Sequence, residues 1–159
     1  MTKPPGRRSG QQAFILREAE GTSQVLLVDP VYMDGFTLPG GSAEANELPH
    51  LAARRHTEVE TGLVLELRDL LAVDYMPASE FPEGLNLVYA GGMLDARQIG
   101  IVDRHQPPAE IRGLHWVSRS EVMSVMQAEQ ACRALEAWDA WNSGSGLPLL
   151  LRGVAAPAA

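Results

Sequence analysis

The chain has 159 residues, of which 45% are hydrophobic and 21% charged, and its formal net charge is -7. This length suits one domain with a substantial core, and the composition is typical of globular proteins. The negative charge argues against a nucleic-acid partner, because phosphate backbones select basic surfaces, and no run approaches the ~20 apolar residues of a membrane span. The single cysteine, Cys132, excludes an intrachain disulfide. We therefore expect a cytoplasmic monomer or homodimer with no nucleic-acid and no membrane partner.

The ends of the chain differ in composition from its middle. Residues 1–11 are rich in Pro, Gly and basic residues, which predicts a disordered N-terminal tail. Residues 12–152 are expected to form a single domain, and the small residues of 153–159 a flexible C-terminal tail.

The first half of the domain predicts three strands followed by a helix. Apolar runs at 11–19 and 23–30, separated by Glu20, Gly21 and Thr22, are typical of an antiparallel strand pair, and a third short strand should end at Pro39–Gly41. The pattern then becomes helical from Pro49 to Thr61. Pro49 suits the first helical turn, and Gly62 suits the position after the last.

The second half predicts strands at 63–76, 85–94 and 111–118, a polar loop at 97–110, and two helices. The first helix begins near Ser118 and Glu121, which have capping-box spacing, and the second covers 128–144. Strands grouped around one helix, with more helices at the end, predict a mixed sheet covered on both faces. The expected fold class is therefore α/β (α+β), a three-layer α/β/α sandwich.

Residues 41–63 form a spaced motif. Gly41, Glu47, Arg55, Gly62 and Leu63 stand at the fixed positions of G-x5-E-x7-R-E-U-x-E-E-x-G-U, where U is aliphatic, without a gap. This stretch resembles the Nudix box. The preceding "FTLPGG" and the later "EIRGLHWVSRSEV" look like the flanking elements of that family, so the resemblance covers about residues 12–142.

The resemblance implies a hydrolase of a nucleoside diphosphate linked to another moiety. In the family, carboxylates on one helical face bind one to three divalent ions, usually magnesium, which activate water for attack on phosphorus. This sequence departs from the pattern at His56, Thr57 and Val59, where the family has Glu, an aliphatic residue and Glu. We interpret Val59 as a packing residue. Only Glu60 of the paired carboxylates remains.

The candidate metal ligands are Glu60, His56 and Glu44. Glu60 and His56 lie four residues apart on one helical face, and Glu44 lies in the glycine-rich loop. With fewer carboxylates, a divalent cofactor, Mg²⁺ or Mn²⁺, should bind weakly. The resemblance gives Glu47 and Arg55 another role, that of an ion pair that braces the loop against the helix. Glu60, His56, Arg55 and Glu47 together form the predicted catalytic set.

Two further groups have alternative interpretations. Phe36, Tyr75 and Tyr89, with Phe81, could stack on a base of the substrate or be ordinary core residues. Asp103 and Glu110 precede the last strand, where some family members recruit an acidic base, but they could be solvated loop charges.

Two functions remain open at this level. The intact loop, Arg55, Glu47 and Glu60 favour a metal-dependent Nudix hydrolase with weak or atypical catalysis. The missing carboxylates favour a catalytically inactive Nudix-fold protein that binds a nucleotide or another small metabolite. In both cases the partner is a nucleotide-like small molecule.

Overall fold

The computed structural model describes residues 3–4, 6–144, 147, 149–151 and 153–155. The predicted antiparallel pair is present as β1 (Arg8–Ala19) and β2 (Thr22–Pro30), with Ala19 opposite Thr22. β1 begins earlier than predicted, and its first half pairs with two other strands, β3 and β5. The expected disorder is therefore wrong for residues 8–11, because their backbone groups find hydrogen-bond partners in the sheet.

The box helix has the predicted limits. α1 covers Pro49–Thr61, with Pro49 in its first turn and Gly62 as a left-handed C-cap at φ 79°. The remaining elements follow in chain order: β3 (Gly40–Ser42) before α1, and then β4 (Leu70–Met76), β5 (Gly84–Met93), α2 (Ala96–Arg104), β6 (Ile111–Ser118), η1 (Arg119–Glu121), α3 (Val122–Val125), α4 (Ala128–Ser143), β7 (Leu149–Leu151) and β8 (Val154–Ala155).

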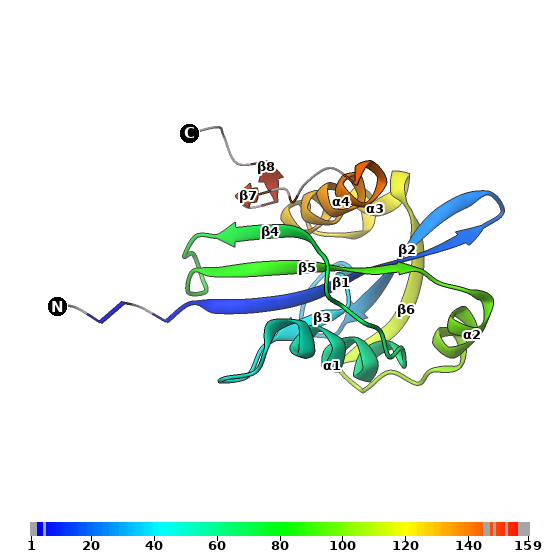
Figure 1. Cartoon of the computed structure of the whole chain (residues 1–159), viewed down its shortest axis with the longest axis horizontal. Coiled ribbons are helices and arrows are strands. Elements are labelled where there is room, and N and C mark those ends of the chain that lie inside the picture. Colours follow the sequence, from blue (N-terminus) through cyan, green and yellow to red (C-terminus); the bar gives the residue numbers. More distant parts are fainter. Residues whose placement is uncertain (1–2, 5, 145–146, 148, 152, 156–159) are drawn as a thin grey trace.

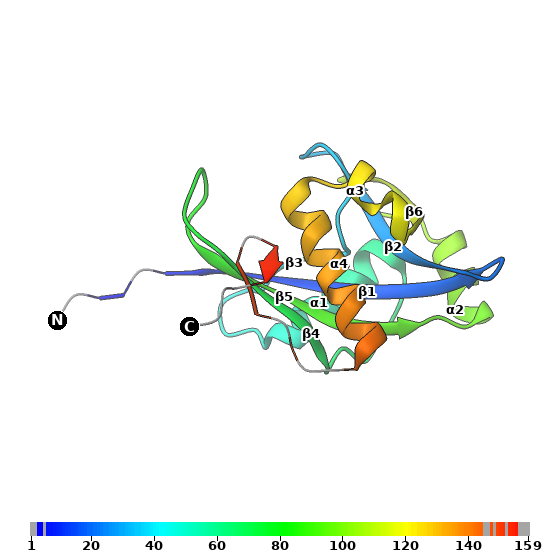
Figure 2. The same cartoon turned by 90° about the horizontal axis from the view of Figure 1, so that it is seen from above.

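The central sheet is mixed, and helices cover both faces. Among the described residues the strand order is β6-β2-β1-β5-β4-β7-β8, with β3 paired to β1. β1 and β5 run parallel, as do β4 and β7, whereas the other pairs are antiparallel. Figure 1 shows α1 and α2 below the sheet and α3 and α4 above it, and Figure 2 shows α4 lying across the strands. The predicted three-layer sandwich is confirmed.

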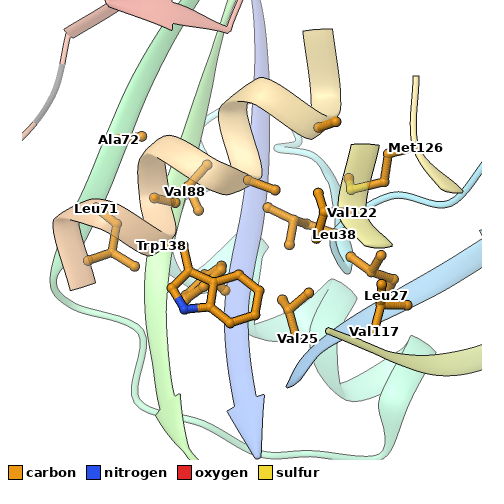
Figure 3. Packing of buried hydrophobic residues seen from close by; sticks show 14 of the residues in the cluster. Val25, Leu27, Leu38, Leu71, Ala72, Val88, Val117, Val122, Met126 and Trp138 are labelled. Atoms are coloured by element: carbon orange, nitrogen blue, oxygen red, sulfur yellow. The ribbon is translucent and has the colours of Figure 1, made fainter. Parts of the chain in front are cut away.

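Alternation along β1 explains why there are two cores. Phe14 and Leu16 face the cluster beneath α3 and α4, whereas Ala13 and Ile15 face the cluster around α1 and α2. Successive side chains of a strand point to opposite faces, so one strand supplies both layers. In Figure 3, Trp138 points from α4 into the first cluster, and its ring meets that of Phe14 edge-on at 5.5 Å.

Three elements differ from the sequence-based prediction. The expected polar loop at 97–110 contains α2, whose start is a complete capping box between Asp95 and Gln98. The strand expected over 32–41 is reduced to bridges at Phe36 and Thr37, with β3 starting only at Gly40. β4 begins at Leu70 rather than at residue 63.

The C-terminal segment joins the edge of the sheet. β7 extends the sheet beside β4 in parallel register, and β8 folds back on β7. The N–H of Gly153, within the tail predicted to be flexible, donates to the buried side chain of Asp74 at 2.9 Å, and residues 156–159 lie outside the described part of the chain. Within that part, none of the helices combines the length and the hydropathy that crossing a membrane requires.

Candidate active site

The glycine-rich loop lies directly on β1. Gly40 stands opposite Gln12 in the β1–β3 ladder, and its φ of 151° lies in the region that favours glycine. A Cβ at this position would lie 2.0 Å from the carbonyl oxygen of Gln11, so only glycine permits the approach. The N–H of Gly40 consequently points at the box helix and donates to Oε2 of Glu60 at 2.9 Å.

Glu60 is the titratable group at the centre of the site. Its side chain belongs to the buried face of α1, and the residue is 8% exposed. Burial raises the pKa of its carboxyl to about 7; the hydrogen bond from Gly40 acts in the opposite direction, and the negative charge of Glu110 raises the pKa further. The carboxyl can therefore gain or lose a proton near neutral pH.

A hydrogen bond joins the loop before β6 to the same helix. Nε2 of His105 lies 2.9 Å from the carbonyl oxygen of Val59, which can only accept, so His105 donates. This segment carries Glu110, whose charge acts on both Glu60 and Tyr32. Glu110 thus belongs to the electrostatic surroundings of Glu60, whereas Asp103 lines a separate pocket with His105.

The three departures from the box pattern have different local roles. Nε2 of His56 donates to the carbonyl oxygen of Ser42 at 2.9 Å, which leaves only Nδ1 as a base or ligand. Thr57 is fully buried, and its Oγ1 has no hydrogen-bond partner among the described residues. Val59 is 53% exposed, so its interpretation as a packing residue is wrong: the helix buries Thr57 and Glu60 instead.

The ion pair expected to brace the loop is present. Arg55 donates from Nε and Nη2 to the two carboxylate oxygens of Glu47, at 2.8 and 2.7 Å. These bonds lower the pKa of the Glu47 carboxyl to about 2, assisted by the backbone N–H of Glu44. The side chain of Glu44 itself is 78% exposed and lies 4.0 Å from Arg55. The pair therefore fixes the loop to α1.

The donors predicted for a metal ion do not converge. Glu60 faces the N–H of Gly40, His56 faces the loop carbonyl, and Glu44 faces Arg55. Over the described ranges, no three His, Cys, Asp or Glu side chains come close enough to hold a metal ion. Magnesium requires a near-octahedral shell of oxygen ligands, and one buried carboxylate supplies little of it. The residues present do not fit a resident magnesium ion.

A cavity of about 740 Å³ lies next to this site, with walls from β1, β5 and α4. Gln12, which stands opposite Gly40, is one lining residue, and Tyr32 is another. Partial burial and then the charges of Glu60 and Glu110 raise the pKa of Tyr32, which places these groups within electrostatic range of one another. Glu60 itself does not line the cavity, and Tyr32 is the lining residue on which its charge acts.

The predicted substrate-binding aromatics lie elsewhere. Phe36 stacks on His115 with ring centroids 4.4 Å apart and packs against the core beneath α3 and α4. Tyr89 is 4% exposed in the other core, and Tyr75 donates its hydroxyl to Glu83 at 2.5 Å. None of the three is among the described residues that line the cavity, whereas Phe81 is.

The family follows from a match over most of the chain. The model of the family described as "NUDIX domain" matches residues 7–138. The chain belongs to the Nudix family. No curated protein matches the sequence. The match includes the glycine-rich loop, α1 and the loop before β6, whereas the end of α4 and the C-terminal segment lie beyond it.

Solved Nudix structures share this fold. A MutT protein from Methanosarcina mazei Go1 superposes with a TM-score of 0.69 at 19% identity, covering 89% of this chain and 99% of that chain. The NUDIX domain of Shewanella oneidensis NrtR, complexed with ADP ribose, gives 0.68 at 14% identity, with 86% and 90% covered. A C. elegans Ap4A hydrolase gives 0.63 at 18% identity, with 87% and 99% covered. At these identities the likeness establishes the fold.

Several residues of the site could not be predicted from the sequence. Tyr32 precedes the glycine-rich loop without any motif that marks it. Asp74 and Arg133 form an ion pair in which Nε donates to Oδ2 at 2.6 Å, although 59 positions separate them. In the sequence, Asp74 is one polar residue in an apolar strand, and Arg133 is one charged residue on an amphipathic helix. A lone acid in a buried strand is the signal that could have suggested a buried partner.

Proposed function

We propose that this Nudix domain hydrolyses a nucleoside diphosphate linked to another moiety, with weak and atypical catalysis. The observation that carries the proposal is Glu60, a buried carboxyl with a pKa of about 7 that accepts a hydrogen bond from Gly40 in the glycine-rich loop. A carboxyl that titrates near neutral pH is suited to general acid–base catalysis. The family and its hydrolase neighbours support the same reaction class.

In the proposed step, the oxygen of a water molecule forms a bond to phosphorus while the bridging P–O bond breaks. Ionised Glu60 accepts a proton from that water, and the leaving phosphate departs with the electron pair of the broken bond. Glu60 then releases its proton to solvent. Glu47 and Arg55 do not touch the reacting atoms in this proposal; they hold the loop and its Gly40 N–H in place against α1.

The proposal includes a divalent cofactor, Mg²⁺ or Mn²⁺, only as a weakly bound ion. Glu60 is the carboxylate that such an ion would meet, with water and ligand oxygens completing its shell. Calorimetric titration with each ion, on the wild type and on Glu60→Gln, tests this assignment. Tight magnesium binding that is equal in both proteins would remove Glu60 as a ligand.

Turnover of defined nucleotides tests the proposed reaction. ADP-ribose, UDP-glucose and diadenosine tetraphosphate would be incubated with the full chain, and monophosphate products followed by phosphorus NMR. Glu60→Gln should lower the rate at least about a hundredfold, the usual size of a general-base contribution. Glu58→Gln, an exposed carboxylate on the same helix, is the matched control and should leave the rate unchanged. Equal rates in wild type and Glu60→Gln would refute the assigned role.

A second candidate, a nucleotide-binding protein without hydrolysis, is favoured by one observation. The described residues contain no cluster of three metal-ligating side chains, and His56 is committed to Ser42. Binding of a nucleotide from the same panel with no product after prolonged incubation would replace the hydrolase by this function.

A further inference from the structure

The wall of the cavity contains a buried ion pair. The side chains of Arg133 and Asp74 are 5% and 0% exposed, and Arg133 lines the cavity. Besides its bond to Asp74, the guanidinium donates from Nη1 to Oε1 of Gln12 at 3.1 Å. Gln12 in turn donates to Thr37 at 3.3 Å and stands opposite Gly40. The pair is thus connected to the strand on which the glycine-rich loop lies.

The guanidinium retains hydrogen-bonding capacity toward the cavity. The partner of Nη2 is the sulfur of Met76 at 3.5 Å, a weak acceptor. A ligand oxygen would be a better partner for this N–H than a thioether. Because Asp74 already balances the charge of Arg133, a neutral acceptor such as a carbonyl or ring oxygen is sufficient here.

The C-terminal segment completes the partners of Asp74. Oδ2 of Asp74 accepts from Arg133, and Oδ1 accepts from the N–H of Gly153. Gly153 has a φ of 78°, and a Cβ there would lie 2.3 Å from the carbonyl oxygen of Glu129, so the segment reaches Asp74 only with glycine at this position. This segment lies beyond residue 138, where the family match ends.

We infer that residues 149–151 and 153–155 are part of the ligand site: Gly153 and Asp74 are positioning residues that hold Arg133 so that its Nη2 donates to an acceptor oxygen of the bound ligand. This inference rests on the proposed function, because it assigns the contact to the same nucleotide-like ligand. A buried carboxylate must have all its acceptors satisfied. Loss of the Gly153 N–H leaves Oδ1 unpaired, and Asp74 then turns to a different partner and releases the orientation of Arg133.

A pair of glycine variants separates positioning from general strain. Gly153→Ala forces the segment away from Asp74. Gly144→Ala is the matched control, because Gly144 is also left-handed at φ 61° but none of the described residues places an atom within 4 Å of an added Cβ. For the nucleotide of the panel that binds the wild type most tightly, calorimetry should show about a tenfold loss of affinity in Gly153→Ala and no loss in Gly144→Ala.

A double-mutant cycle tests whether Gly153 acts through Arg133. Arg133→Lys keeps the charge but lacks Nη2, so it should also lose about tenfold in affinity. If Gly153 acts through Arg133, adding Gly153→Ala to this background causes no further loss. Losses that multiply in the double variant would overturn the positioning role.

A measurement without ligand distinguishes failure of the inference from failure of the proposed function. In ¹⁵N-labelled full-length protein, the Nε–H of Arg133 should exchange slowly with water in the wild type and in Gly144→Ala, and rapidly in Gly153→Ala. Slow exchange that persists in Gly153→Ala refutes the inference, whatever binds. If the exchange rates are as expected but the wild type binds no nucleotide, the proposed function and the ligand contact are refuted. The positioning of Arg133 by Gly153 and Asp74 is then still supported.

Discussion

Replacing Glu60 by glutamine should change how the stability of the protein depends on pH. The carboxyl has an ordinary pKa of 4.5 and a pKa of about 7 in the fold, mainly because of burial. Between these values the folded protein holds a proton that the unfolded chain has released. The free energy of unfolding therefore falls as pH rises through this window, and the contribution of protonated Glu60 is lost above pH 7.

The magnitude follows from the rise in pKa. Each unit is worth ~1.4 kcal/mol, so a rise from 4.5 to about 7 corresponds to roughly 3 kcal/mol. Because Glu60 is 8% exposed, solvent screening reduces this figure little. Glutamine keeps the acceptor for the Gly40 N–H and cannot ionise. The free energy of unfolding of Glu60→Gln should equal that of the wild type near pH 4.5 and exceed it by roughly 3 kcal/mol near pH 8.

Urea unfolding in chelator, at several pH values from about 4.5 to 8, measures this difference directly. Chelator removes any metal ion that would stabilise the ionised carboxylate and hide the effect. Glu58→Gln, which removes an exposed charge from the same helix, should differ from the wild type by a small amount that does not vary across the window. A difference between Glu60→Gln and wild type that stays constant with pH would refute a raised pKa at Glu60.

Three further predictions concern other parts of the site. Asp74→Ala leaves Arg133 buried without its partner and should cost roughly 3–5 kcal/mol in chemical unfolding, whereas a loss below about 1 kcal/mol would mean that the pair is solvated. Arg55→Ala should lower the melting temperature by less than Asp74→Ala, because its ion pair is more exposed; an unchanged melting temperature would show that the brace is absent in solution. His56→Glu combined with Val59→Glu should be less stable than wild type in chelator and regain stability with magnesium, as thermal unfolding can show. If calorimetry detects no gain in magnesium affinity in this double variant, the added carboxylates do not restore the metal site of the family.

The sequence was most informative where local signals are strong. Pro49 and Gly62 delimit α1 as predicted, because a proline at the start and a left-handed glycine at the end act within one turn. The resemblance to the Nudix box likewise implied the ion pair of Glu47 and Arg55. The prediction missed α2, although Asp95 and the glutamine three residues later have capping-box spacing.

The orientation of side chains on α1 was only partly predictable. Helical spacing placed Glu60 and His56 on one face, and Val59 was interpreted as a packing residue, but the fold buries Thr57 and leaves Val59 half exposed. The loop that meets this helix at His56 and Glu60 is positioned by its pairing with β1, which the spacing of residues along the helix does not encode. The cavity could not be predicted from sequence patterns either, because the hydrogen bond between Arg133 and Gln12 in its wall joins residues 121 positions apart.

The tether between His105 and Val59 has a consequence for acidification. Nε2 of His105 carries a hydrogen both in the neutral tautomer that donates to this carbonyl and in the imidazolium ion. The hydrogen bond does not involve the carboxyl of Glu60, so the segment that carries Glu110 keeps its attachment to the last turn of α1 when that carboxyl is protonated. A fall in pH can neutralise Glu60 without releasing its acidic neighbour, so charge and geometry at this site respond to acid independently.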